Sequence, residues 1–237
     1  MANIKINKPI LKKIDKAVQN YSENRDQFKH LAKTVLSNLY ETSKLGQYIH
    51  STKFRAKKPD HLRDKLIRKA IEAKQKNKDF DIGTDNLYSK IDDLAGVRLL
   101  HLHTIQMTKI HPAILEVLDE HMYRVIGKPT AYTWDIEYKD ILENIGLKTV
   151  LRKSMYTSVH YIVEANRKTK MRCEIQVRTL MEEVWGEVSH TLNYPQETGV
   201  FACKEQLKVL ARVASGCTRL VDSIFSCYED HNRSISK

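Results

Sequence analysis

Residues 171–178 (MRCEIQVR) alternate strictly between polar and apolar side chains. Cys173, Ile175 and Val177 fall on one face. The side chains on the opposite face are Arg172, Glu174, Gln176 and Arg178. A period of two predicts a β-strand with one buried face. The carboxylate, amide and guanidinium groups of the polar face are suited to hold a metal ion, a hydroxyl and a phosphate.

This strand is the second half of a predicted hairpin. Residues 158–164 (SVHYIVE) form the first strand, and a polar turn joins the two. A helix is predicted directly after the hairpin, with Thr179 as its N-cap and Glu182 at the capping-box position. The hairpin and the helix that follows it are the clearest local unit in the sequence.

The remaining pattern predicts helices on both sides of a sheet region. Helices are expected over residues 8–45 (one or two of them), 60–78, 112–121 and 204–228, with Pro59 and Pro112 near helix starts. Strands are expected over residues 97–102, 122–126 and 149–151, and a loop over 80–87. This order predicts one α+β domain with helices at both ends.

The composition favours a polyanionic partner. The 237 residues carry a net charge of +11, which is typical of proteins that bind nucleotides, phosphates or RNA, although a solvated basic surface gives the same number. No apolar run reaches about 18 residues, and no leader sequence is visible, so we expect no membrane span. The four cysteines lack zinc-type spacing, so reduced thiols and a cytoplasmic location are predicted.

Two charged groups precede the hairpin. Arg55, Lys57 and Lys65 lie before and within the basic helix, where they can converge on a polyphosphate; a solvated helix face is the alternative. Asp93 precedes the apolar strand, with Arg98 inside that strand. A carboxylate at the start of a strand suits a hard cation, or it is a turn residue.

The hairpin adds an aromatic ring and a second carboxylate. Tyr156 can stack on a base, or it is a core residue. Glu174 can pair with Asp93 to hold Mg²⁺, or act as a general base on a hydroxyl. The alternative is that Glu174 is a salt-bridge partner of Arg178 or Arg172.

Together these residues resemble the synthetase domain of the RelA/SpoT family, the pyrophosphokinases that make the alarmone (p)ppGpp. The resemblance spans about residues 40–200 and rests on five motifs in order: Arg55, Lys57 and Lys65; Asp93 to Arg98; Tyr156, Ser158 and His160; Glu174 to Thr179; and Trp185, His190, Asn193 and Tyr194. It implies a mixed β-sheet flanked by helices, related to nucleotidyltransferases. The implied organisation is an N-terminal helical extension (1–40), the synthetase domain (41–200) and a C-terminal helix (201–237).

The resemblance also implies a reaction and a role for each residue. ATP gives its β,γ-pyrophosphate to the 3′-hydroxyl of GTP or GDP and releases AMP. Arg55 and Arg98 would sandwich the adenine, and Lys57 and Lys65 would hold the ATP phosphates. Asp93 and Glu174 would hold Mg²⁺, and Glu174 would also take the hydroxyl proton. On the acceptor side, the contacts would come from Tyr156, His160, Gln176, Arg178 and Asn193.

Three positions depart from the family pattern: His61 replaces a serine, Met155 replaces a glycine, and Pro195 replaces a lysine. We expect Met155 to be unable to adopt positive φ easily. The basic charge and this changed position leave a second acceptor open, the 3′-CCA end of tRNA, as in toxin-type relatives. A non-catalytic nucleotide- or RNA-binding module is a third reading. For the terminal helices, self-association, an antitoxin protein and the domain core are the candidate partners.

Overall fold

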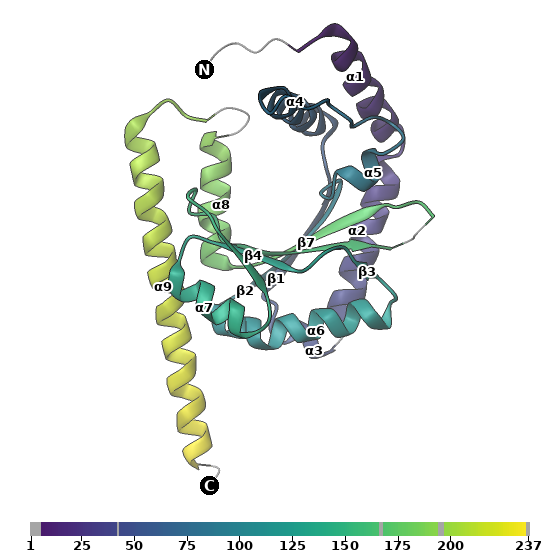
Figure 1. The fold of residues 1–237 in the computed structure, drawn as a ribbon. Helices are drawn as coiled ribbons and strands as arrows, with labels where there is room; N and C mark the ends of the chain where they lie inside the picture. The colour runs from purple at the N-terminus through teal and green to yellow at the C-terminus, as the bar shows by residue number, and fades with distance from the viewer. Residues whose placement is uncertain (1–5, 42, 166–167, 194–196, 236–237) are drawn as a thin grey trace.

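The computed structural model describes residues 6–41, 43–165, 168–193 and 197–235. Its centre is a mixed sheet of order β1-β2-β7-β6-β4-β5, with β3 paired to β6, and helices flank it on both sides (Figure 1). The strands are β1 (Ser51–Ala56), β2 (Ala95–His101), β3 (Arg124–Val125), β4 (Thr130–Thr133), β5 (Lys148–Leu151), β6 (Ser158–Glu164) and β7 (Arg172–Thr179). The predicted α+β class with a mixed sheet is confirmed.

The hairpin of β6 and β7 forms as the alternation predicts. The two strands pair antiparallel, and β7 also pairs parallel with β2, which places β7 in the middle of the sheet. Cys173, Ile175 and Val177 are almost completely buried. The polar face of β7 is therefore free to form a site.

The helices are α1 (Lys8–Glu23), α2 (Arg25–Glu41), α3 (Ser43–Gly46), α4 (Pro59–Gln75), α5 (Leu87–Lys90), α6 (Met107–Glu120), α7 (Ile136–Asn144), α8 (Leu180–Asn193) and α9 (Phe201–Ile235). Figure 1 shows α4 and α8 on the side of the sheet opposite α6. Helices α1 and α2 contribute Tyr21, Phe28 and Val35 to the same hydrophobic cluster as the strands. The segment expected to be an N-terminal extension thus packs into the core of the domain.

The start of α8 is fixed by the predicted capping box. The backbone N–H of Glu182 donates to the Thr179 hydroxyl (3.2 Å), and the N–H of Thr179 donates to a Glu182 carboxylate oxygen (2.7 Å). Both bonds satisfy donors that a helix start leaves unpaired. They hold α8 at the end of β7.

Several elements differ from the sequence prediction. Helix α6 begins at Met107, so Pro112 lies inside it rather than near its start; its ring fixes a helical φ, and one backbone hydrogen bond is lost. Helix α9 begins earlier and ends later than predicted. Strand β1 was not expected, because most of its residues are exposed or half-buried and show no alternation.

None of the helices in the described part of the chain is long and apolar enough to cross a membrane.

Candidate functional site

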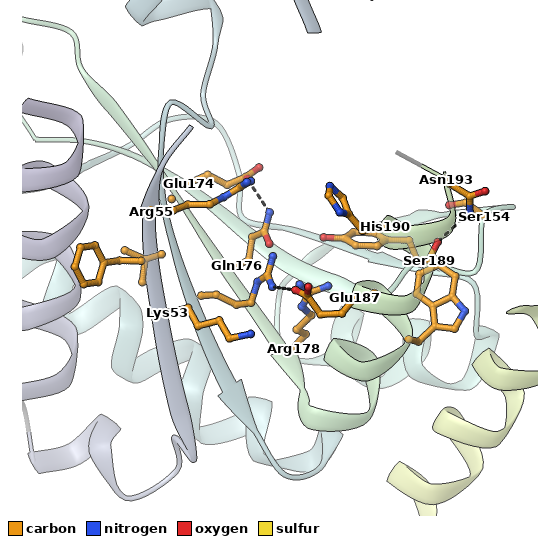
Figure 2. A pocket seen from close by; sticks show the side chains of 17 residues that line it. Lys53, Arg55, Ser154, Glu174, Gln176, Arg178, Glu187, Ser189, His190 and Asn193 are labelled. Carbon is orange, nitrogen blue, oxygen red and sulfur yellow. Dashed lines mark hydrogen bonds and ion pairs between the residues drawn. The ribbon is translucent and has the colours of Figure 1, made fainter. Parts of the chain in front are cut away.

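A cleft of about 630 Å³ opens between the polar face of the sheet and helix α8 (Figure 2). Strands β1, β2 and β7 form its floor, and α8 forms its wall. Its lining includes seven of the predicted site residues: Arg55, Arg98, Tyr156, Glu174, Gln176, Arg178 and Asn193. Segments that are far apart in sequence thus meet at one place.

Strand register explains how these residues come together. Lys53 is paired with Arg98, Arg98 with Gln176, and Gln176 with His160, so these four residues form one row across four strands. The next row contains Arg55, Gly96 and Glu174. Residues paired in this way point to the same face of a sheet.

Glu174 is held by two neighbours on this face. His160 Nδ1 lies 3.0 Å from Oε1, and Gln176 Nε2 donates to Oε2 at 2.7 Å. Burial by itself raises the pKa of Glu174, but the contacts with His160 and Gln176 together outweigh it, and the pKa lies below its usual value. The carboxylate is therefore ionised at neutral pH. It pairs with neither Arg178 nor Arg172, which excludes the salt-bridge alternative among the contacts described.

Asp93 is enclosed by two lysines. Lys57 Nζ lies 2.8 Å from Oδ2, and Lys65 Nζ lies 2.8 Å from Oδ1. Burial opposes ionisation of Asp93, but the two ammonium groups hold its pKa far below the ordinary range. Although Oδ1 is close to Lys65, it makes no aligned hydrogen bond to any described residue. Asp93, Lys57 and Lys65 thus form one cluster beside the cleft, not in its lining.

The N-terminal helices support this cluster. The Tyr21 hydroxyl donates to the backbone carbonyl of Lys57 (2.7 Å), and Arg25 Nε donates to the same oxygen (3.1 Å). Burial raises the pKa of Tyr21 to about 12. Neither residue was predicted to serve the site, because nothing in the local sequence of α1 or α2 shows which backbone carbonyl it will meet.

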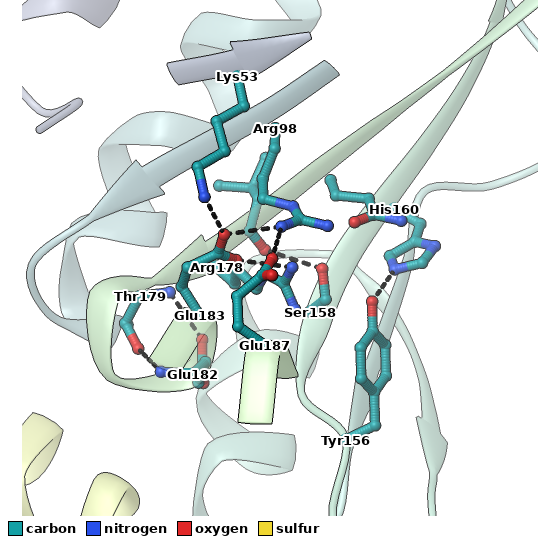
Figure 3. Close-up of polar contacts among 12 residues, drawn as sticks. Lys53, Arg98, Tyr156, Ser158, His160, Arg178, Thr179, Glu182, Glu183 and Glu187 are labelled. Carbon is teal, nitrogen blue, oxygen red and sulfur yellow. Dashed lines mark hydrogen bonds and ion pairs between the residues drawn. The ribbon is translucent and has the colours of Figure 1, made fainter. Parts of the chain in front are cut away.

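A second cluster involves residues that the motifs did not single out (Figure 3). Glu183 contacts Lys53 (2.9 Å), Arg98 (2.7 Å) and Arg178 (2.6 Å). Glu187 makes a further ion pair with Arg98 (2.8 Å). The signal available in the sequence was the spacing of four residues, which puts Glu183 and Glu187 on one face of a helix.

Tyr156 lies beside the hairpin, with its hydroxyl 2.9 Å from His160 Nε2. The preceding residue, Met155, has φ of 60°. The expectation that Met155 avoids positive φ is therefore wrong: the chain adopts the left-handed conformation there at a cost of about 1 kcal/mol or more. The replacement of glycine by methionine therefore leaves the positive φ at this position in place.

Asn193 ends α8 at the cleft and accepts a hydrogen bond from the backbone of Thr198 (3.2 Å). His61, on α4, lies opposite His190 of α8, with ring centres 6.5 Å apart. Tyr194 and Pro195, which belong to the last motif, lie outside the described residues.

The carboxylates fit the predicted Mg²⁺. Protein sites for this ion often supply one or two carboxylates and leave the other positions to water and substrate phosphates. Asp93 and Glu174 are close enough for the charge of Asp93 to affect the pKa of Glu174, and Asp93 Oδ1, although 2.8 Å from Lys65 Nζ, makes no aligned hydrogen bond to a described residue. No group of three or more acidic, His or Cys ligands exists among the described residues, so the substrate would have to complete the coordination.

Comparisons with known proteins agree with this architecture. A family model described as a region found in RelA/SpoT proteins matches residues 54–199. The chain is 25% identical to the GTP pyrophosphokinase YwaC of Bacillus subtilis (strain 168) over an alignment of 187 residues that covers 76% of this chain and 76% of that protein.

The fold is similar to solved small alarmone synthetases. The chain matches the crystal structure of small alarmone synthetase 2 from Bacillus subtilis with a TM-score of 0.58 and 18% identity, covering 87% of this chain and 98% of that one. For small alarmone synthetase 1 from the same organism, bound to its product pppGpp, the TM-score is 0.54 at 18% identity, with coverage of 92% and 99%. These likenesses show the fold, and the match of the family model across most of the chain shows the family. The chain therefore belongs to the RelA/SpoT family, with the fold of a synthetase domain.

Proposed function

We propose that this chain transfers the β,γ-pyrophosphate of ATP to the 3′-hydroxyl of GTP or GDP, forming (p)ppGpp and releasing AMP. Family membership and the likeness to a GTP pyrophosphokinase make it a pyrophosphokinase of the transferase class. The observation that carries the choice of reaction is that Arg55, Arg98 and Glu174 line the same cleft on one face of the sheet.

The ATP side is assigned to the cations. Arg55 and Arg98 come from paired strands and line the cleft, so their guanidinium planes can stack on adenine. Lys57 and Lys65 now neutralise Asp93 from 2.8 Å each. A bound triphosphate offers both ammonium groups additional oxygens, and charge neutralisation of this kind supplies much of the catalysis of phosphoryl transfer.

The acceptor side is assigned to the hairpin. Tyr156 would stack on the guanine, and His160, Gln176, Arg178 and Asn193 would contact the ribose and phosphates. Arg178 is well placed for a phosphate because its side chain is buried and its Nε has no hydrogen-bond partner among the described residues. A buried donor without a partner is costly unless a ligand satisfies it.

Glu174 is assigned as the general base. The acceptor 3′-oxygen attacks the β-phosphorus of ATP, the bond from this phosphorus to the bridging oxygen of the α-phosphate breaks, and AMP leaves with that oxygen. The hydroxyl proton passes to the ionised carboxylate of Glu174. Mg²⁺, held by Asp93 and Glu174, would neutralise charge that develops on the phosphate oxygens. The role of the protein is mainly to position the two substrates.

The acceptor is tested directly. The protein is incubated with γ-labelled ATP and Mg²⁺, and GDP, GTP and deacylated tRNA are supplied in separate reactions. We expect labelled pppGpp or ppGpp. Label on tRNA alone, the second candidate favoured by the net charge of +11, would overturn this acceptor. No transfer to any acceptor would support the non-catalytic binding module instead.

A further inference from the structure

We propose that Glu183 is a positioning residue that fixes the arginine of the ATP side, Arg98, and the arginine of the acceptor side, Arg178, in one arrangement. The substrate assignments of the two arginines rest on the proposed function. The inference about Glu183 itself rests on its contacts.

The geometry is that of one buried carboxylate shared by three cations. Its Oε1 lies 2.7 Å from Arg98 Nη1 and 2.9 Å from Lys53 Nζ, while its Oε2 lies 2.6 Å from Arg178 Nη2. The side chain of Glu183 is 8% exposed, whereas that of Lys53 is 59% exposed. Water therefore weakens the attraction of Glu183 for the two arginines far less than its attraction for Lys53.

The two arginines repel each other without this carboxylate. They come from the paired strands β2 and β7, and burial together with the charge of Arg98 lowers the pKa of Arg178. Burial opposes ionisation of Glu183 too, but Arg178, Lys53 and Arg98 outweigh it and hold its pKa below the usual range. Removing one partner of a buried ion pair leaves the other charges uncompensated.

The backbone of α8 is adapted to the same contact. Gly186, one turn after Glu183, lies so close to Arg178 that a Cβ atom there would be 2.5 Å from Nη1. The guanidinium of Arg178 is thus confined between a carboxylate and a helix backbone. Such confinement favours one orientation of the planar guanidinium. This orientation determines the direction in which its remaining N–H groups point.

Glu187 provides a matched control. It is on the same helix and contacts Arg98 at 2.8 Å, but its side chain is 56% exposed, and among the described residues the ion-pair partner of Arg178 is Glu183 rather than Glu187. We expect Glu187→Gln to weaken binding of the ATP analogue AMPCPP modestly and to leave GDP binding unchanged. We expect Glu183→Gln to weaken both by about tenfold or more, because both arginines lose their fixed orientation.

The experiment measures dissociation constants of AMPCPP and GDP separately by calorimetry, for wild type, Glu183→Gln, Glu187→Gln and Glu183→Asp. The aspartate keeps the charge and should recover part of the loss. If Glu183→Gln does not fold, Glu183→Asp tests the proposal instead, and we expect it to bind both nucleotides more weakly than wild type does. Unchanged binding of either nucleotide in a folded Glu183 variant would overturn the proposal, since a merely structural role lowers the melting temperature alone.

A crystal structure of the Glu183→Gln or Glu183→Asp variant tests the positioning role of Glu183 independently of the proposed reaction. If wild type transfers to tRNA and not to GDP, the proposed acceptor fails, yet Arg98 and Arg178 should still both move in the variant. Arginines that keep their positions in that crystal would overturn the positioning role whatever the acceptor is.

Discussion

The imidazole of His160 lies 3.0 Å from a carboxylate oxygen of Glu174, and its other nitrogen lies 2.9 Å from the Tyr156 hydroxyl. If the hydroxyl donates to Nε2, the neutral ring carries its proton on Nδ1 and donates it to Glu174. The proposed base and the proposed stacking ring are thereby connected through one histidine.

His160→Phe should shift the pH dependence of turnover. The phenyl ring keeps the packing against Tyr132 but donates nothing to Glu174, so the burial that raises the pKa of this carboxyl is offset only in part, by the hydrogen bond from Gln176. We expect the acidic limb of the kcat profile to move to higher pH and kcat at neutral pH to fall about tenfold or more. Tyr156→Phe is the control, because it retains the contact between His160 and Glu174. An unchanged acidic limb in His160→Phe would show that this contact does not set the ionisation of the base.

Glu174→Gln and Asp93→Asn should each reduce turnover by on the order of 10²–10³-fold or more. Glu174→Gln removes the proposed proton acceptor and a charge that would hold Mg²⁺, whereas Asp93→Asn removes only such a charge. Asp92→Asn is a matched control: it is the neighbouring residue, but it pairs with Arg172 (2.7 Å) away from the cleft lining. We expect near-normal turnover for this control, measured as AMP release. Near-normal turnover in either of the first two variants would remove that residue from the proposed centre.

Gly186→Ala should impair the acceptor step. The new Cβ would be 2.5 Å from Arg178 Nη1, so the guanidinium must move, and a shift of about 1 Å can reduce kcat/KM on the order of 10²-fold. Gly216→Ala is the control, since nothing lies within 4 Å of its added Cβ. It should leave kinetics unchanged and stabilise α9 by about 1 kcal/mol. Equal kinetics for the two variants would contradict the tight fit at Gly186.

Glu182→Gln should flatten the dependence of stability on pH. Burial raises the pKa of Glu182 to about 7, so its protonated form is favoured in the folded state. The contribution of this protonation to the free energy of unfolding is complete below the ordinary pKa of 4.5 and is lost as the pH rises through 7. The total loss is up to about 3 kcal/mol. Glutamine keeps the capping-box acceptor without ionising. Urea unfolding at pH 5 and pH 8 should show a smaller difference in the free energy of unfolding for the variant than for wild type. If both proteins lose the same free energy between these pH values, Glu182 is not the cause of the pH dependence.

The sequence was most informative where one strand carries its own pattern. Strand β7 was predictable because it alternates between polar and apolar side chains, β6 because it precedes a polar turn as the other half of the hairpin, and Thr179 with Glu182 marks a helix start by itself. Strand β1 lacks alternation, since its position at the edge of the sheet leaves most of its side chains accessible. The roles of Glu183 and Tyr21 depend on partners from distant segments, which no local pattern encodes.

The row of Lys53, Arg98, Gln176 and His160 has a consequence for folding. Strands β2 and β7 are neighbours in the sheet, although more than seventy residues separate Arg98 from Gln176 along the chain. Pairings between such distant segments require large loops to close and form slowly. We therefore expect the helices and the β6–β7 hairpin, which depend on local contacts, to form before the floor of the cleft is complete. A chain whose strands are still unpaired would therefore lack the cleft in which we propose that ATP binds.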